Sequence, residues 1–289
     1  MEIAPEPVSV RRMLWNGTIP LKIVLAQQER NTLDLIQPYY INAHRLSYLP
    51  FLFERVLAFF KPYLRDPESA SSYEWWFEFE DVPLRWNWPI GLLYDLLTGL
   101  DPALEDIADH DWHLPWSITI HFNDYPADSL LRLTSVKDVE DQWMNRVKES
   151  DFIRRGNSNT VMNLSRADSD NMWAAVVKYD FDMFWNTARK LLPQNAISLN
   201  HVPVKIYLPS SNKILQSLIT PMISPKEVQT VGTALHTQLG YLFPSRRTYI
   251  LAKPIVHGIS VPMSAPLAEL LYECMYTDGY LHICIVMIS

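Results

Sequence analysis

The chain has 289 residues, a net charge of −7 and a pI near 5.6. This acidic balance argues against broad binding to nucleic acid, because neutralising phosphates requires a basic face. Hydrophobic residues make up 48%, enough for a substantial core, and a count of only eight glycines argues against Gly-rich phosphate loops.

The sequence shows no sign of secretion or membrane insertion. The first ten residues lack the apolar core of a signal peptide, and no apolar run approaches the ~20 residues that a membrane span needs. Cys274 and Cys284 lie in apolar surroundings, unlike the regular cysteines of a secreted disulfide framework. We therefore expect a cytoplasmic protein.

The first half of the chain predicts alternating strands and helices. Residues 19–25 form a predicted strand with a proline near its start, where a missing N–H is tolerated. Residues 50–61 place apolar side chains at helical spacing, and residues 75–80 alternate aromatic and acidic side chains as a half-buried strand does. A helix is predicted to open after Pro89, and residues 116–122 form an apolar strand.

The middle of the chain changes to a helical pattern. Residues 135–138 form a capping pattern, and the apolar residues of the stretch 139–147 then fall on one face, with Gly156 as a natural stop. A second capping pattern at residues 165–168 begins another helical stretch, which continues up to Pro193.

The last part of the chain repeats the order of the first. Residues 202–208 resemble residues 19–25, and three further matches follow in the same order: 261–263 with 82–84, 266–272 with 89–94, and 280–286 with 116–122. Strands around a helix resemble the β-grasp fold of ubiquitin. The predicted fold class is α+β, with two ubiquitin-like β-grasp domains flanking a helix-rich module. The predicted divisions are an N-terminal helix (1–15), the first domain (16–122), a linker (123–137), the helix-rich domain (138–194) and the second domain (200–289).

A zinc-dependent or cysteine enzyme is the alternative from a different class. It would be built around His110, His113 or Cys284. Nothing in the sequence fixes a third or fourth zinc ligand near the two histidines, and Cys284 lies in an alternating strand without an evident base. No nucleophile elbow, Walker or Rossmann motif is present. We therefore expect no catalytic residue, metal or cofactor.

Several short stretches together resemble fungal members of the autophagy protein 5 family. They are WNGTIP (15–20), WFEFE (76–80), WPIGLLYDLL (88–97), KESD (148–151), FDMFW (181–185) and LHI (281–283). The resemblance covers nearly the whole chain, and its specificity lies in the order and number of the motifs.

The resemblance implies a non-enzymatic scaffold. Family members join the ubiquitin-like autophagy-related protein 12, normally through an isopeptide bond to a lysine, and bind a helix of autophagy-related protein 16. The assembly acts like an E3 ligase and promotes attachment of autophagy-related protein 8 to phosphatidylethanolamine. This implies a cytoplasmic protein that is recruited to the preautophagosomal membrane and contacts it transiently.

The resemblance implies that the acceptor lysine follows the aromatic-proline pair, here Tyr125-Pro126. Residues 127–136 contain no lysine, and neither Asp128 nor Arg132 can replace it, because a carboxylate gives no amide and a guanidinium stays protonated. This favours noncovalent pairing with protein 12, and conjugation through Lys137 is the alternative.

Two further surfaces follow from the resemblance and from the residue types. Trp15, Trp86 and Trp88 are predicted to frame the groove for the protein 16 helix, since Trp is a favoured interface anchor. Three arginine pairs, at residues 11–12, 154–155 and 246–247, could contact lipid headgroups if they converge in space. Of these, Arg11, Arg12, Arg154 and Arg155 are the predicted lipid contacts. A generic peptide-binding module outside autophagy remains a second alternative.

Overall fold

The computed structural model describes residues 9–68, 70, 74–100, 114–193, 195, 198–209, 211 and 213–288. The chain divides into two compact units, one of residues Thr18–Arg146 and one of residues Met1–Gly17 with Val147–Ser289.

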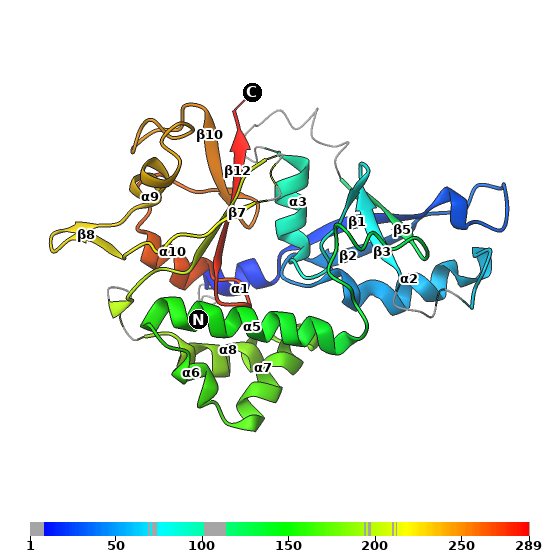
Figure 1. Ribbon diagram of the computed structural model, residues 1–289, viewed down its shortest axis with the longest axis horizontal. Coiled ribbons are helices and arrows are strands. Elements are labelled where there is room, and N and C mark those ends of the chain that lie inside the picture. The colour runs from blue at the N-terminus through cyan, green and yellow to red at the C-terminus, as the bar shows by residue number, and fades with distance from the viewer. Residues whose placement is uncertain are drawn as a thin grey trace, which may run out of the picture. The chain divides into compact units, whose positions relative to one another are not determined.

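The first unit contains a five-stranded sheet in the order β2-β1-β5-β3-β4 (Figure 1). Its strands are β1 (Thr18–Leu25), β2 (Tyr39–His44), β3 (Trp76–Phe79), β4 (Val82–Pro83) and β5 (Trp116–His121). Its helices are α2 (Phe53–Phe60) and α3 (Ile90–Thr98). Ile19, Leu21 and Ile23 of β1 are all buried, as the period of two along a strand requires when one face meets the core.

The predicted helix at residues 50–61 is divided in the structure. A 3-10 turn at Leu49–Leu52 precedes α2, and another at Lys61–Tyr63 follows it. Val56 and Phe60 are four residues apart and both fully buried, so the helical spacing found in the sequence does mark the core face.

A buried carboxylate fixes the end of β5. Glu29, from the turn after β1, accepts hydrogen bonds from the backbone amides of Phe122 and Asn123, each at 3.1 Å, and from the Asn123 side chain at 2.6 Å. A buried charge is tolerated when its oxygens are satisfied in this way.

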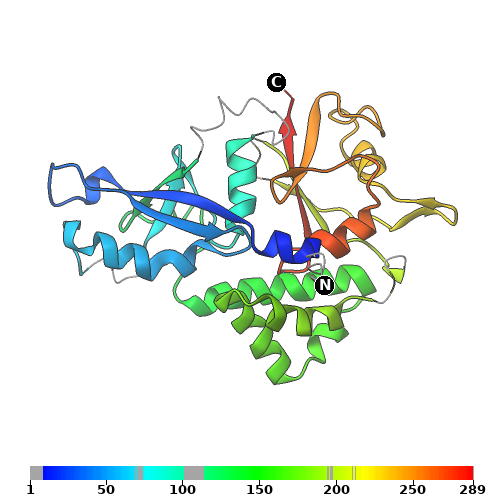
Figure 2. The same cartoon turned by 180° about the vertical axis from the view of Figure 1, so that it is seen from behind.

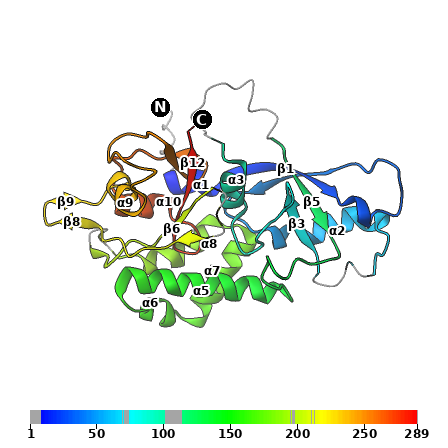
Figure 3. The same cartoon turned by 45° about the horizontal axis from the view of Figure 1, so that its top comes forward.

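The second unit contains a sheet in the order β11-β10-β12-β6-β7 and a separate β8–β9 hairpin, which stands away from that sheet in Figure 3. Its strands are β6 (Val204–Tyr207), β7 (Ile214–Leu215), β8 (Met222–Ser224), β9 (Glu227–Val228), β10 (Ala252–Val256), β11 (Ile259–Ser260) and β12 (Leu281–Met287). Its helices are α1 (Val10–Trp15), α6 (Asn159–Met162), α7 (Arg166–Lys178), α8 (Phe181–Ala188), α9 (Val231–Gln238) and α10 (Leu267–Cys274).

The long helix α5 (Val136–Arg155) runs through the boundary between the two units at residues 146 and 147. Its start is capped by Asp138, whose carboxylate accepts from the backbone amides of Thr134 and Ser135 at 2.6 and 2.9 Å. Hydrogen bonds from Thr134 and Ser135 hold the pKa of Asp138 below its ordinary value.

The second helical stretch begins as predicted but does not run unbroken to Pro193. The Ser165 hydroxyl caps α7 by accepting from the Asp168 amide at 3.0 Å, which confirms that capping prediction. Tyr179 then adopts a left-handed conformation with φ of 59°, and Asp180 caps a new helix, α8. Figure 2 shows α7 and α8 packed side by side.

The two five-stranded sheets have the same topology. The closing strands β5 and β12 each pair in parallel with the first strand of their unit, β1 or β6, and antiparallel with β3 or β10. Pro89 and Pro266 each occupy the N-cap of the following helix, and each forms an isolated bridge, to Tyr48 and Thr230 respectively. The predicted α+β class, with two β-grasp domains and a helical module, is confirmed.

Candidate functional site

A cavity of about 370 Å³ opens on the first unit, beside the chain that leaves β5. It is lined by Arg85, Trp86, Asn87, Trp88 and residues 127–131. It therefore brings together two tryptophans predicted for the helix groove and part of the stretch predicted for protein 12.

The Leu131 carbonyl fixes the shape of this cavity. Trp86 Nε1 donates to it at 2.7 Å, and the Tyr125 hydroxyl donates to it as well. With its backbone held in this way, Leu131 turns a side chain that is 55% exposed toward solvent. Leu131 is therefore an exposed apolar side chain at a concave surface, where a partner could contact it. The sequence did not single it out, because nothing in it separates Leu131 from the neighbouring Leu130 and Leu133, which are buried.

Two arginine side chains contact the segment 85–88 of the cavity lining. The Arg85 guanidinium lies 4.6 Å from the centre of the Trp88 ring, within cation–π range. Arg146, on α5, donates to the backbone carbonyl of Asn87.

Burial raises the pKa of Tyr125, which therefore stays protonated and remains a hydrogen-bond donor at neutral pH. The wall of the cavity is thus already formed in this chain alone.

The other residues predicted for protein 12 lie around or beyond this cavity. Asp128 is exposed on its lining, and Arg132 is exposed just after it. Lys137 lies in the first turn of α5, where its ammonium pairs with Asp141 at 2.9 Å. The hydrogen bond and charge of Asp141 raise the pKa of Lys137 and keep its amine protonated.

The three tryptophans predicted for the helix groove are all buried, and they fall in different units. Trp86 and Trp88 belong to the first unit, and Trp15 belongs to the second. Trp15 ends α1, and its ring centre lies 4.8 Å from Tyr179 and 5.2 Å from Phe184. Its Nε1 donates to the Tyr179 carbonyl at 3.3 Å, and the Tyr179 hydroxyl donates to the Trp15 carbonyl at 2.7 Å.

A second cavity of about 370 Å³ lies beside this aromatic cluster. Arg12, Trp15, Asn16 and residues 178–182 line it. Arg12 pairs with Asp182 and lies 4.3 Å from the centre of the Phe181 ring. Trp15 thus forms part of a wall and not an exposed anchor.

The arginines predicted to contact lipid are engaged within the second unit. Arg11 donates to the Tyr272 carbonyl at 2.7 Å, and Arg155 pairs with Asp151 at 3.2 Å. Arg154 is 1% exposed, so its burial excludes it as a lipid contact.

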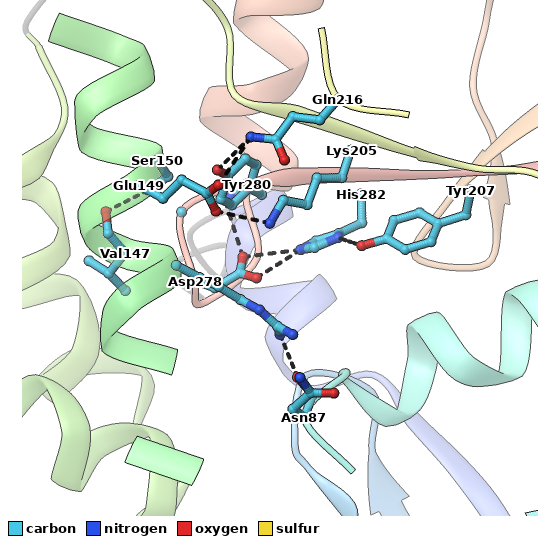
Figure 4. A network of polar contacts seen from close by, with 12 residues as sticks. Asn87, Val147, Glu149, Ser150, Lys205, Tyr207, Gln216, Asp278, Tyr280 and His282 are labelled. Atoms are coloured by element: carbon cyan, nitrogen blue, oxygen red, sulfur yellow. Dashed lines mark hydrogen bonds and ion pairs between the residues drawn. The ribbon is translucent and has the colours of Figure 1, made fainter. Parts of the chain in front are cut away.

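A polar seam binds the C-terminal half of α5 to the second sheet (Figure 4), and it is buried at Ser150 and Arg154 but half exposed at Glu149. Glu149 pairs with Lys205 of β6 at 3.2 Å, and Gln216 donates to Glu149 at 3.4 Å and to the Tyr280 hydroxyl at 3.2 Å. Arg154 donates to the Gly279 carbonyl and to the Ser150 hydroxyl, each at 3.1 Å. Burial lowers the pKa of Arg154 to about 10, so the guanidinium remains charged at neutral pH.

The seam continues into the sheet as a chain of side chains. His282 Nε2 lies 3.0 Å from Asp278 Oδ2, and His282 Nδ1 lies 2.7 Å from the Tyr207 hydroxyl (Figure 4). All three residues are buried. The sequence signal for this network was a histidine within an otherwise apolar strand, since such a residue needs polar partners.

The enzymatic alternative gains no support from the described residues. His110 and His113 lie outside the described residues. Among those that are described, no group of three or more His, Cys, Asp or Glu side chains could hold a metal. Cys284 is buried in β12, and burial raises the pKa of Cys274 to about 11, which keeps it a thiol at neutral pH. None of the described helices is both long and apolar enough to cross a bilayer.

These features define a protein with two ubiquitin-like domains built around a helical module. Models of Autophagy protein ATG5 match in three parts: the UblA domain at residues 14–122, the alpha-helical bundle region at 136–194 and the UblB domain at 201–285. The chain belongs to the autophagy protein 5 family.

Relatives extend over almost the full chain. Autophagy protein 5 of Aspergillus fumigatus is 43% identical and that of Aspergillus oryzae 41%, each over 97% of this chain and 96% and 98% of the relative. The crystal structure of Kluyveromyces marxianus Atg5 superposes with a TM-score of 0.77, covering 95% of this chain and 98% of that chain. At 22% identity, that structure supports the fold alone.

Replacement of Gly279 by alanine should destabilise the second unit by about 2 kcal/mol or more. Gly279 has a φ of +85°, and an added Cβ would lie 2.2 Å from the Ser150 hydroxyl oxygen. Gly99→Ala is the matched control, because Gly99 also has a positive φ of +61° but no atom of the described residues within 4 Å of the added Cβ. Denaturant unfolding of both variants measures the difference, and equal losses would contradict a close approach at the seam.

The ion pair of Glu149 predicts an acid-sensitive second unit. Burial raises the pKa of Glu149, but Lys205 and hydrogen bonds from its neighbours together bring it below its ordinary 4.5. A carboxylate with a lowered pKa stabilises the fold above pH 4.5, and this contribution is lost as the pH falls through the folded-state pKa. Glu149→Gln should therefore lower the free energy of unfolding by less than ~1 kcal/mol at neutral pH, because the side chain is half exposed. It should also reduce the fall of the free energy of unfolding below pH 4.5.

Urea unfolding as a function of pH measures this effect. The matched control is Glu227→Gln, at an exposed carboxylate of the same unit. If Glu149→Gln and Glu227→Gln show the same pH dependence, the proposed electrostatic role of the Glu149–Lys205 pair is wrong.

Proposed function

We propose that this chain is a non-catalytic scaffold of an E3-like complex in autophagy. In this proposal it pairs with ubiquitin-like autophagy-related protein 12 and binds a helix of autophagy-related protein 16. The assembly promotes attachment of autophagy-related protein 8 to phosphatidylethanolamine, and the chain is cytoplasmic until it is recruited to the preautophagosomal membrane. Membership of the autophagy protein 5 family along nearly the whole chain is the observation that carries the proposal.

The cavity of the first unit supports a place for pairing with protein 12. It joins a rigid wall, formed by buried tryptophans, to the exposed Leu131 side chain. Pre-formed concave surfaces with an apolar contact at the rim bind a partner with little reorganisation. A stable complex needs a buried interface above ~1,200 Å², so the cavity is one part of a larger contact surface.

The cavity of the second unit supports a contact with the protein 16 helix. Aromatic side chains of α1, of α8 and of the turn between α7 and α8 line it, and Arg12 and Asp182 provide charged groups. An amphipathic helix binds such surfaces with apolar anchors at helical spacing. In this proposal Trp86 and Trp88, which are both buried, form part of the wall of the first cavity and do not contact the protein 16 helix.

Whether protein 12 is bound covalently depends on which lysine amine can form an isopeptide bond. The absence of lysine from residues 127–136 excludes an acceptor only within that stretch. Lys137 pairs with Asp141 at 2.9 Å, and this carboxylate raises the pKa of the Lys137 amine, so the ion pair disfavours the free amine that conjugation requires. Lys148, also on α5, is half-buried and has no carboxylate partner among the described residues. We propose that the cavity pairs noncovalently and that any isopeptide bond is formed by Lys148, not Lys137.

Reconstitution of protein 8 lipidation on vesicles tests the scaffold role. Adding this chain with proteins 12 and 16 to the conjugating enzymes should stimulate lipidation, and no stimulation would contradict the proposal. Leu131→Asp should weaken pairing with protein 12 by about tenfold or more, because a carboxylate would replace an apolar side chain that pairing is proposed to bury. Leu33→Asp is the matched control, since Leu33 is fully exposed in the same unit away from the cavity lining.

A denaturing gel decides the mode of pairing. The chain is incubated with protein 12 and its activating enzymes, and the conjugate is detected as a shifted band. We expect Lys137→Arg to leave the result unchanged and Lys148→Arg to abolish any shifted band. A band that is lost in Lys137→Arg would contradict the argument from the Asp141 ion pair. Co-purification of both variants with protein 12 under native conditions measures the noncovalent contribution.

A further inference from the structure

One end of the second sheet exposes four aliphatic side chains in a cluster. Ile250 is 52% exposed, Leu251 44%, Met287 47% and Ile288 38%. The backbone joins them, because the Ile288 amide donates to the Leu251 carbonyl at 3.0 Å and Met287 pairs with Ala252 at the start of β10. Figure 1 shows this end of β10 and β12, where the C-terminus is marked.

Two arginines precede this cluster in the loop between α9 and β10. Arg246 and Arg247 are exposed, and in the part of the chain that the structure describes neither guanidinium pairs with a carboxylate. Both lie within five residues of Leu251, so their backbone is at most ~17 Å from it. We refer to Arg246, Arg247, Ile250, Leu251, Met287 and Ile288 as the basic-apolar end.

The loop that carries the arginines is anchored. The Arg246 carbonyl approaches Gly232 of α9 so closely that a Cβ there would lie 2.1 Å from its oxygen. The Tyr249 hydroxyl donates to the Val261 carbonyl at 2.5 Å. Contacts at both ends of the segment 246–249 therefore hold its backbone against the rest of the second unit.

The charge around this end contrasts with that of the whole chain. No Asp or Glu occurs between Glu227 and Glu269, or after Asp278. Residues 200–289 hold six Lys and Arg residues against four Asp and Glu residues, although the chain as a whole carries −7. A basic surface on an acidic protein directs one face toward an anionic partner.

Exposed aliphatic side chains beside unpaired guanidinium groups fit a phospholipid surface. Guanidinium groups bind phosphate and carboxylate headgroups with several hydrogen bonds, and aliphatic side chains enter the boundary between headgroups and acyl chains. The segments 228–268 and 279–289, which contribute this end, contain no Asp or Glu and so add no charge that an anionic bilayer would repel. The arginines of α1 and α5 do not compete for this role, since they bind groups of the protein itself.

We propose that the basic-apolar end of the second β-grasp domain docks on an anionic lipid surface. The inference rests on the proposed function, which brings the chain to a membrane, and it identifies the surface that makes the contact.

Flotation of the purified chain with vesicles tests the proposal. The vesicles contain phosphatidylcholine and phosphatidylethanolamine, with or without phosphatidylserine. Binding should require phosphatidylserine and should weaken at high salt, because the electrostatic part is screened. Arg246→Glu with Arg247→Glu should weaken it by about tenfold or more. Ile250→Ser with Met287→Ser should also weaken binding but leave its salt dependence in place.

Matched controls separate this surface from charge in general. Arg55→Glu with Arg65→Glu makes the same charge change at exposed positions of the first unit and should bind as the original chain does. Equal loss in both arginine pairs, or full binding by the Arg246/Arg247 variant, would overturn the proposal. Self-association at this end without vesicle binding would overturn it too.

Partner binding shows which proposal has failed. The Arg246/Arg247 variant should still pair with protein 12 and with the protein 16 helix. If the original chain pairs with both partners but does not float with vesicles, the docking surface alone is wrong. If it pairs with neither, the proposed function is wrong.

Discussion

Arg154 lies buried in the second unit with its guanidinium bonded to the Gly279 carbonyl and the Ser150 hydroxyl. Burial of a charge is costly unless its donors are satisfied. Both terminal nitrogens of Arg154 reach acceptors in this arrangement of helix and sheet, whereas its Nε has no hydrogen-bond partner among the described residues. The bend at Gly279 must take a positive φ, and no side chain can be placed there because Ser150 occupies the space. The attachment of α5 to β6 and β12 depends on this constraint, since the Glu149–Lys205 pair lies next along the same helix.

The same strand topology serves both β-grasp domains, but the two domains expose different chemistry. In the first, the segment after β5 folds back on Trp86 and forms a cavity with a leucine at its rim. In the second, the corresponding closing strand ends in exposed aliphatic residues beside an acid-free loop. Each surface is built from segments outside the shared core, which is how one fold supports several kinds of contact.

Both cavities are lined by aromatic side chains that are held by hydrogen bonds to backbone carbonyls. Trp86 donates to Leu131, and Trp15 donates to Tyr179. An indole that is buried and bonded in this way is part of the fold, so its replacement reports on folding before it reports on binding. The exposed residues at the rims are therefore better probes of partner recognition than the tryptophans beneath them.

The sequence is enough to predict the features that depend on local spacing and on order along the chain. It gave the strand and helix periodicity, the Ser165 cap and the repeated order of elements that predicts two β-grasp domains, because these signals lie within a few residues or recur in two copies. Only the tertiary structure shows which side chains are buried and which are exposed. Arg154 and Gly279 are 125 residues apart and Trp15 and Tyr179 are 164 apart, so no local pattern shows that one buries the other. For the same reason the sequence could not distinguish Arg154, which is buried in α5, from the exposed arginines at residues 246–247, because burial is set by contacts between distant segments.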